Sequence, residues 1–219
     1  MFSNKELRSM IITLFFEQLL VMLVGIVDTF VVSSCGEAAV SGVSLVNQFN
    51  TIFIYLFTAL ASGGAIVVSQ YIGNKDEKRT ILSSSQLLMF SIVFSIILSI
   101  LVLIFNKQLL GLLFGKVESD VMKACVTYLR ISAYSYPALA IYNAGAALYR
   151  SMAKTKVTMY ISFAANIINV VGNIIGVYVL KAGVAGVAYP SLISRVFSAI
   201  IITVLCFNKK LEAYYDSKD

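Results

Sequence analysis

SMIITLFFEQLLVMLVGIVDTFVVS, residues 9–33, is the first long apolar run of this chain. A helix that crosses a bilayer needs about 20 mostly apolar residues, and this run is long enough. It contains two acidic residues, Glu17 and Asp28, and it lacks a small-residue cleavage site. We therefore interpret it as a retained membrane span and not as a cleaved signal peptide.

Five further segments have the length and composition of spans: residues 43–71, 81–105, 122–149, 157–180 and 184–207. The chain of 219 residues is 59% hydrophobic and 13% charged, whereas soluble domains are about 25% charged. The runs are apolar at odd and even positions alike, which does not fit the alternation of a spanning β-barrel. We predict an all-α integral membrane fold of six transmembrane helices over residues 1–208. Residues 209–219 are predicted to be a short, frayed, polar cytoplasmic tail.

The distribution of Lys and Arg predicts the orientation, because cytoplasmic loops carry the excess of positive charge. Loops on one side hold eleven of these residues and loops on the other side hold four. The larger set is Lys5, Arg8, Lys75, Lys78, Arg79, Arg150, Lys154, Lys156, Lys209, Lys210 and Lys218; the smaller is Lys107, Lys116, Lys123 and Lys181. Both termini are thus expected in the cytoplasm and the chain in the plasma membrane.

The composition excludes several kinds of chemistry. There is no His, so His-based metal sites and Ser-His-Asp catalysis are ruled out, and no GxSxG or P-loop motif is present. We predict no enzyme activity and no cofactor. The net charge of +6 comes from residues that form no continuous basic face, so nucleic acid is not an expected partner. The three cysteines are predicted to be buried thiols in helices.

Glu17 and Asp28 are the two acidic residues of the first span. Eleven residues separate them, which places both on one helix face about 16 Å apart. A carboxylate at the centre of a bilayer costs about 2.5–3.5 kcal/mol, so each needs a cavity or a partner. Either they face water and bind a cation or a proton, or they pair with Arg130 or Arg195, the two Arg inside predicted spans.

Polar residues at helical spacing mark other spans. Residues 157–180 carry Ser162, Asn166, Asn169 and Asn173 on one face. Asn47 and Thr51 share a face of the second span, and Arg195 lies in the sixth. These faces either line one shared cavity or form interhelical hydrogen bonds. We favour the cavity, with Glu17, Asn47, Thr51, Asn166 and Arg195 on its wall. Gly172 and Gly176 predict close helix packing, and Pro137 predicts a kink.

Several separated blocks resemble the multidrug and toxic compound extrusion (MATE) transporters. They are FEQLL at 16–20 with VGIVDT at 24–29, GEAAVSGVSL at 36–45, and GGA at 63–65 with SQYIG at 69–73. Residues 166–173, GVAGVA at 183–188 and SLISR at 191–195 resemble the fifth and sixth spans of that family. The blocks occur in the family's order and cover nearly the whole chain.

The resemblance implies a secondary active antiporter that exports organic cations and drugs in exchange for protons or sodium ions. It implies that Asp28 binds the coupling ion, as a proton or sodium site, with Asn169, Asn173 and Ser191 beside it. The chain departs from the family at two positions. Asn173 stands where many members have a second Asp, and Thr13 stands where a proline is expected.

The family has twelve spans in two six-span lobes, whereas this chain resembles the N-terminal lobe alone. We expect a fragment, with a homodimer or a separately encoded second lobe as alternatives. The expected partners are the lipid bilayer, a small organic substrate and a second six-helix lobe. Two other functions stay open: a flippase of related fold for lipid or polysaccharide precursors, which buried Arg would favour, and a lobe that does not transport.

Overall fold

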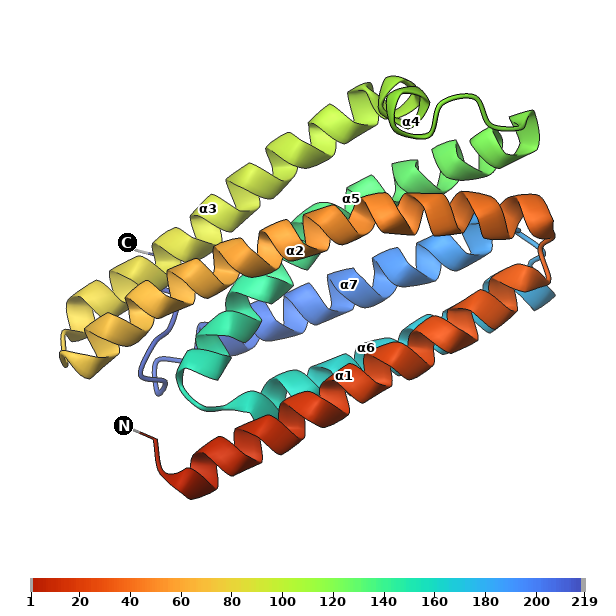
Figure 1. Cartoon of the computed structure of the whole chain (residues 1–219). Coiled ribbons are helices and arrows are strands. Elements are labelled where there is room, and N and C mark those ends of the chain that lie inside the picture. The colour runs from red at the N-terminus through yellow and green to blue at the C-terminus, as the bar shows by residue number, and fades with distance from the viewer. Residues whose placement is uncertain (1, 218–219) are drawn as a thin grey trace.

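The computed structural model describes residues 2–217, which form helices joined by short turns and contain no strand. Figure 1 shows an elongated bundle with both chain ends at the same end of it. In chain order the helices are α1 (Asn4–Ser33), α2 (Glu37–Gly73), α3 (Glu77–Ile104), α4 (Asn106–Phe114), α5 (Ser119–Ser151), α6 (Thr155–Ile174), a π-helical turn η1 (Ile175–Val179) and α7 (Ala185–Cys206). The all-α prediction is confirmed. The cytoplasmic location of the chain ends stays a prediction.

Five of the helical segments within residues 2–217 are long and apolar enough to cross a membrane: α1, α2, α3, α6 with η1, and α7. The predicted span 122–149 lies in α5, which is also long, at 33 residues, but more polar. The reason is its position, since α5 packs against α2, α3 and α7 together. Side chains such as Ser135 and Tyr136 are buried against those helices. A membrane helix surrounded by other helices can carry small and polar residues at its interfaces.

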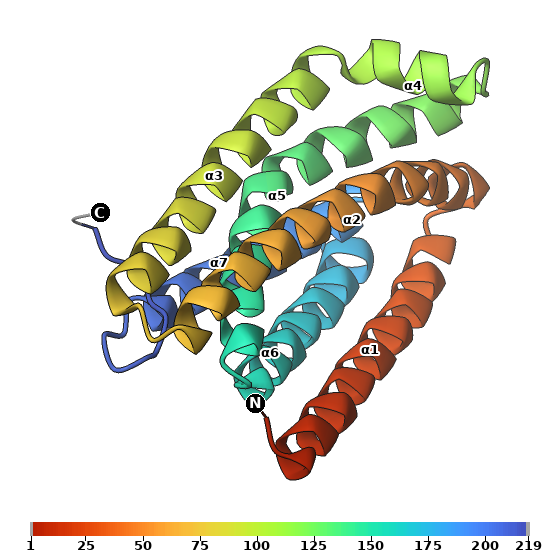
Figure 2. The same cartoon turned by 60° about the vertical axis from the view of Figure 1, so that its left-hand side comes forward.

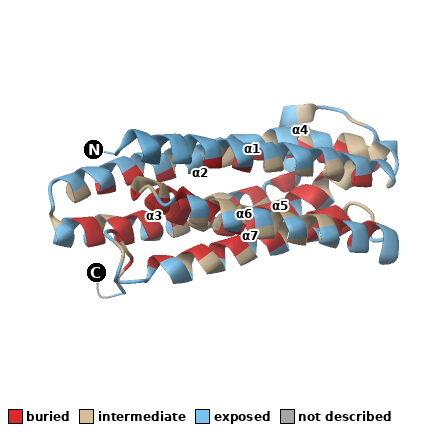
Figure 3. Ribbon diagram, turned by 90° about the horizontal axis from the view of Figure 1, so that it is seen from below, coloured by how far each residue is buried: buried red, intermediate tan, exposed pale blue. Residues whose placement is uncertain are grey.

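Helix α1 is the opposite case. Its buried residues are Thr13, Glu17, Val31 and Val32, and Figure 3 shows it exposed along most of its length. It packs mainly against α6 and only weakly against α2, and in Figure 2 it lies at the edge of the bundle. Protein contacts to Glu17 and Asp28 are therefore available on only one side of α1.

The short helix α4 occupies a region that the sequence had indicated as a break between spans. Its nine residues are too few to cross a bilayer. Leu110 anchors it, because this side chain is completely buried in the core that also contains Val102 and Leu129. The helix ends at Gly115, inside the same predicted break, with a φ of 63°, a value that favours glycine.

Helix α5 contains Pro137 and bends near the middle of its length (Figure 2). Proline lacks an N–H, so the carbonyl of Ala133, four residues earlier, has no partner in the helix. The Ser99 hydroxyl of α3 donates a hydrogen bond to this carbonyl oxygen at 2.6 Å. The kink predicted at Pro137 is thus accompanied by a bond that joins α3 to α5.

Glycine brings α6 and α7 into close contact, as the spacing of Gly172 and Gly176 predicts. A Cβ on Gly172 would lie 2.7 Å from the Pro190 side chain, and a Cβ on Gly176 would overlap the carbonyl of Gly186. The helix widens at the same place into η1, where the Leu180 amide bonds the Ile175 carbonyl at 2.9 Å. Backbone therefore meets backbone where Gly176 of η1 contacts Gly186 of α7.

We predict that Gly176→Ala destabilises the protein by about 1–3 kcal/mol, because the added methyl has backbone and no flexible side chain against it. Thermal unfolding in detergent measures the loss. Gly63→Ala is the matched control, since a Cβ there meets nothing within 4 Å. Equal unfolding midpoints for the two variants would contradict the close α6–α7 contact.

The described part of the segment after α7, residues 207–217, is packed, which corrects the prediction of a frayed tail there; residues 218–219 lie outside the described residues. Ala213 and Tyr215 are buried in a cluster with Met152 and Ile202. The Tyr215 amide bonds the Cys206 carbonyl at 2.8 Å, and the Asp216 amide bonds the Ser85 hydroxyl at 3.0 Å. Its polar composition suggested solvent, but the two buried side chains fit a gap at the ends of α3, α5 and α7.

Burial of Tyr215 predicts that Tyr215→Ala lowers the stability by about 3 kcal/mol, the loss expected for removing a large buried aromatic side chain. Tyr214→Ala, at a neighbouring position that is only half-buried, serves as the control and should change stability much less. Thermal unfolding, followed with a fluorescent dye that does not react with thiols, would measure the change in stability of both variants. A loss as large in the control would mean that the segment is not anchored through Tyr215.

One cysteine also differs from expectation. Cys125 and Cys206 are buried in helices, whereas Cys35 is only partly buried and lies in the turn between α1 and α2. The turn ends at Gly36, whose φ of 106° favours glycine. The turn lies between the predicted spans 9–33 and 43–71, as the sequence indicated, so the expectation of a helical position did not hold for Cys35.

Candidate functional site

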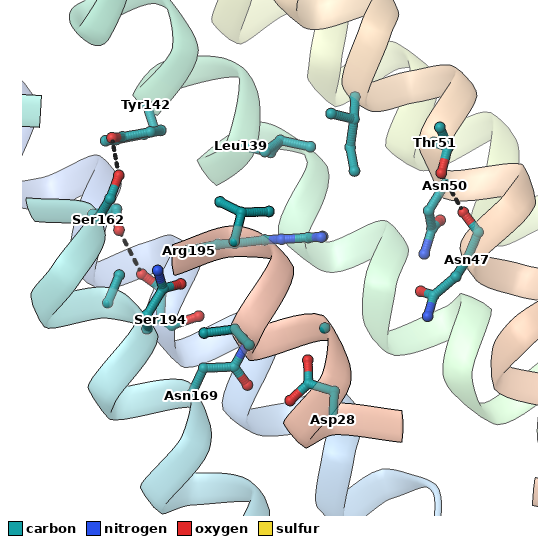
Figure 4. A pocket seen from close by; sticks show the side chains of 17 residues that line it. Asp28, Asn47, Asn50, Thr51, Leu139, Tyr142, Ser162, Asn169, Ser194 and Arg195 are labelled. Carbon is teal, nitrogen blue, oxygen red and sulfur yellow. Dashed lines mark hydrogen bonds between the residues drawn. The ribbon is translucent and has the colours of Figure 1, made fainter. Parts of the chain in front are cut away.

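A cavity of about 570 Å³ lies among the helices α1, α2, α5, α6 and α7. Figure 4 shows its polar side chains converging from these elements. Its wall consists of Val21, Val24, Gly25, Asp28, Asn47, Asn50, Thr51, Ile54, Leu139, Tyr142, Ser162, Ala165, Asn166, Asn169, Ser194, Arg195 and Ser198. A mixed polar and apolar wall of this size suits a small organic molecule.

Six of the nine predicted site residues lie on this wall: Asp28, Asn47, Thr51, Asn166, Asn169 and Arg195. They come from four helices that are distant in sequence. The spacing on each helix placed the residues on one face, and the fold turns these faces toward a common space. The other three, Glu17, Asn173 and Ser191, lie elsewhere.

Asn173 lies beside the cavity and holds Asp28. It is completely buried, and its amide nitrogen donates a hydrogen bond to Oδ1 of Asp28. Its own Oδ1 has no hydrogen-bond partner, and neither does Oδ1 of Asn169. Buried polar atoms normally have partners. A carboxylate and two unpartnered amide oxygens therefore belong to one region of the site, between α1 and α6.

Glu17 lies behind the wall and not on it. Its side chain is buried; Oε1 accepts a hydrogen bond from the Ser162 hydroxyl at 3.0 Å and lies 3.5 Å from a guanidinium nitrogen of Arg150. The hydroxyl of Tyr142 contacts Ser162 at 3.0 Å. The ion-pair partner is thus Arg150, and not Arg130 or Arg195 as the sequence had suggested. Arg130 is exposed on α5.

Ser191 is not on the wall either. Its hydroxyl donates to the Val187 carbonyl of its own helix at 3.3 Å. Ser194 and Ser198, one and two turns further along α7, line the cavity instead. Ser198 and Asn50 are wall residues that the sequence analysis missed. Their signals were present, since Asn50 follows Asn47 by three residues and Ser198 follows Ser194 by four, both spacings of one helix face.

Tyrosines of α5 orient two wall residues of α2. Tyr128 donates a hydrogen bond to Oδ1 of Asn47 at 3.1 Å, and Tyr136 donates to Oδ1 of Asn50 at 2.6 Å. From α7, Arg195 donates a hydrogen bond to the Ser135 hydroxyl of α5 at 2.6 Å. These bonds fix the α2 face of the cavity to the central helix α5.

Within residues 2–217, no three His, Cys, Asp or Glu side chains gather into a group that could hold a metal ion. A cation at Asp28 would instead have one carboxylate and neutral amide oxygens around it. Oxygen donors of this kind suit a proton or a hard cation. The sequence prediction of a proton or sodium site at Asp28 remains a prediction.

Five helical segments within residues 2–217 are long and apolar enough to cross a membrane, and the bundle surrounds a polar cavity, an arrangement that suits a membrane transport protein. The MatE family model matches residues 13–175, and the chain belongs to this family. The family is one of transporters and not of enzymes, and its members are multi-pass membrane proteins.

The chain is 26% identical over 203 residues to the uncharacterized transporter YisQ of Bacillus subtilis, which covers 91% of this chain and 44% of that protein. It is 26% identical over 186 residues to YoeA, a probable multidrug resistance protein of the same bacterium, covering 81% of this chain and 39% of that protein. A MATE crystal structure in the straight conformation superposes with a TM-score of 0.90 at 20% identity, over 98% of this chain and 47% of that one. The chain spans somewhat less than half the length of these relatives.

The ion pair between buried Glu17 and partly buried Arg150 gives a prediction about coupling between α1 and α5. Glu17→Gln and Arg150→Gln should each lower the unfolding midpoint, and the double variant should lose less than the two single losses together. The expected coupling is on the order of 1 kcal/mol. Arg130→Gln is the control, because Arg130 is exposed, and its effect should add to that of Glu17→Gln. Additive effects for Glu17 and Arg150 would show that the pair contributes nothing.

Proposed function

We propose that this chain is one lobe of a secondary active transporter that exports small organic molecules, cations and drugs among them, in exchange for protons or sodium ions. Asp28 binds the coupling ion. The observation that carries the proposal is the position of Asp28: it contributes the one carboxylate on a cavity wall otherwise made of neutral residues and Arg195. The multidrug resistance function ascribed to relatives such as YoeA supports the export of drug-like molecules.

The surroundings of Asp28 support ion binding. Asn173 donates a hydrogen bond to one carboxylate oxygen of Asp28, while the amide oxygens of Asn173 and Asn169 are left without donors. A bound cation or a proton on the carboxylate would satisfy such groups. A buried oxygen without a donor is costly, so binding relieves an existing penalty. Asn173 is also followed closely by η1, and π-helical turns are frequent at functional sites.

Exchange follows if ion and substrate compete for the same cavity or stabilise different shapes of it. Asp28 and the apolar residues Val21, Val24 and Ile54 border one space. A substrate that occupies this space alters the surroundings of Asp28, and an ion on Asp28 alters the charge that the substrate meets. Each ligand then changes the affinity of the other by the same factor. Alternating access to the two sides of the membrane completes the cycle.

A second six-helix lobe completes the transporter in this proposal. Helix α1 is exposed along most of its length, and Asn47 and Thr51 are exposed residues of α2 that nevertheless line the cavity. Polar side chains within the hydrocarbon need partners or water. A second lobe against α1 and α2 would keep this polar wall away from lipid. It would be the C-terminal half of a longer protein of which this sequence is a fragment, another copy of this chain, or a different chain.

The flippase alternative was based on two arginines inside predicted spans, Arg130 and Arg195. Arg130 gives it no support, because this residue is exposed on α5 and does not line the cavity. Arg195 does lie on the wall. A lobe that only packs would gain nothing from a cavity with unpartnered oxygens, so the transporter remains the function that we favour.

Replacement of Asp28 tests the proposal. In an export-competent assembly, Asp28→Asn should remove at least about 90% of dye efflux driven by a proton or sodium gradient, because an amide neither protonates near neutral pH nor carries the charge that binds sodium. Efflux from proteoliposomes under each gradient, and binding of radioactive sodium to the reconstituted protein, measure the effect.

Glu17→Gln is the matched control, since it neutralises a carboxylate of the same helix that lies off the cavity wall. It should retain ion-driven efflux. Unchanged ion-driven efflux by Asp28→Asn would contradict the role of Asp28. Equal loss in both variants would indicate that the effect comes from a damaged α1 and not from the site.

A further inference from the structure

Arg195 carries a positive charge that no acidic side chain of residues 2–217 pairs with directly. The ion pairs Arg79–Asp76 and Arg150–Glu17 involve other arginines. The hydrogen bond of Arg195 is to the Ser135 hydroxyl, a neutral group. A guanidinium has five N–H donors, so most of them remain available. Arg195 lies on the cavity wall within the bundle, where an uncompensated charge is expensive.

The guanidinium points into the cavity and away from Asp28. Figure 4 shows its nitrogen end directed toward the part of α2 that carries Asn47 and Asn50, while Asp28 lies on α1 at another part of the wall. The structure therefore does not use Asp28 to neutralise Arg195. The two charges form separate poles of a single cavity.

The α2 face opposite Arg195 presents further donors. Oδ1 of Asn47 and Oδ1 of Asn50 already accept hydrogen bonds from Tyr128 and Tyr136. An Asn side chain whose oxygen is engaged offers its two N–H groups. Both residues line the cavity. A guanidinium and two amide nitrogens around one space form an environment that favours a negatively charged oxygen group.

The apolar residues of the same wall, among them Ile54 and Leu139, would contact the body of a bound molecule. We propose that Arg195, with the amide groups of Asn47 and Asn50, binds an acidic group of the transported molecule. The cavity then takes amphoteric organic molecules, which carry an acidic and a basic group on an apolar body, in preference to simple cations. This inference rests on the proposed function in one respect: that the transported molecule occupies this cavity.

The test compares two molecules that differ only in the acidic group. An aminomethyl-naphthoate carries both charges, and its carboxamide carries only the positive one. Radiolabelled forms of each are equilibrated with the full chain in phosphatidylcholine nanodiscs, with empty nanodiscs as the blank. The wild-type chain should bind the carboxylate about tenfold more tightly than the carboxamide, as expected for charge-assisted hydrogen bonds.

Arg195→Gln should bind the two molecules with similar affinity, because it keeps polar N–H groups but removes the charge. Arg130→Gln, which removes an exposed arginine of α5, should keep the preference. Absence of a preference in the wild-type chain, or its persistence in Arg195→Gln, would overturn the proposal.

Asn50→Asp provides a second variant in case Arg195→Gln does not fold. It keeps an oxygen to accept the Tyr136 hydrogen bond and places a carboxylate on the face toward which the guanidinium points. This internal acid should compete with the acidic group of the ligand and abolish the preference. A preference that survives in folded Asn50→Asp would also overturn the proposal.

Two sources of the acidic group are distinguished by adding phosphatidylglycerol to the nanodiscs. If an anionic lipid headgroup is the natural occupant, this lipid should displace the naphthoate from the wild-type chain but leave carboxamide binding unchanged. If a free organic acid is the occupant, the lipid should have no effect. Neither measurement needs an ion gradient. The Arg195 result therefore stands or fails separately from the effect of Asp28→Asn on coupled efflux.

Discussion

Polar groups inside the spanning part of this protein must find partners within the protein, because hydrocarbon offers no hydrogen bonds. The arrangement of the helices follows from this constraint. The polar helix α5 lies among α2, α3 and α7, where its serines and tyrosines meet other side chains. The carbonyl left free by Pro137 meets Ser99. Glu17 meets Ser162 and Arg150. The cavity is where this pairing is left incomplete.

Incomplete pairing is what gives the site its chemical character. Around Asp28 the unpartnered atoms are oxygens, those of Asn169 and Asn173. Around Arg195 the available groups are N–H donors, including those of Asn47 and Asn50, whose oxygens are engaged by tyrosines. The same amide side chain thus serves as acceptor or donor according to its neighbour. Second-layer tyrosines on α5 set the polarity of the α2 wall without lining the cavity.

Hydrophobic runs and helical spacing were sufficient to predict the long helices and six of the seventeen residues that line the cavity. Asp28, Asn166 and Asn169 were found because a polar residue in a span stands out against its background. The packed segment at Tyr215 could not be predicted in this way, since its burial depends on a gap formed by three other helices. The partner of Glu17 was also missed. Arg150 lies at the end of α5 and was counted as a loop residue, although its side chain reaches α1.

The contacts of α1 have a consequence for how the protein is made. Asp28 and Glu17 bond residues that follow them by 145 and 133 positions respectively. The ribosome therefore synthesises the two acidic residues long before the residues that donate hydrogen bonds to them. Most of the other helices are made in the interval. An unpaired carboxylate is costly in lipid, and α1 gains the partners of both acids only once α5 and α6 have been made. The first helix of the chain therefore completes its contacts late in synthesis.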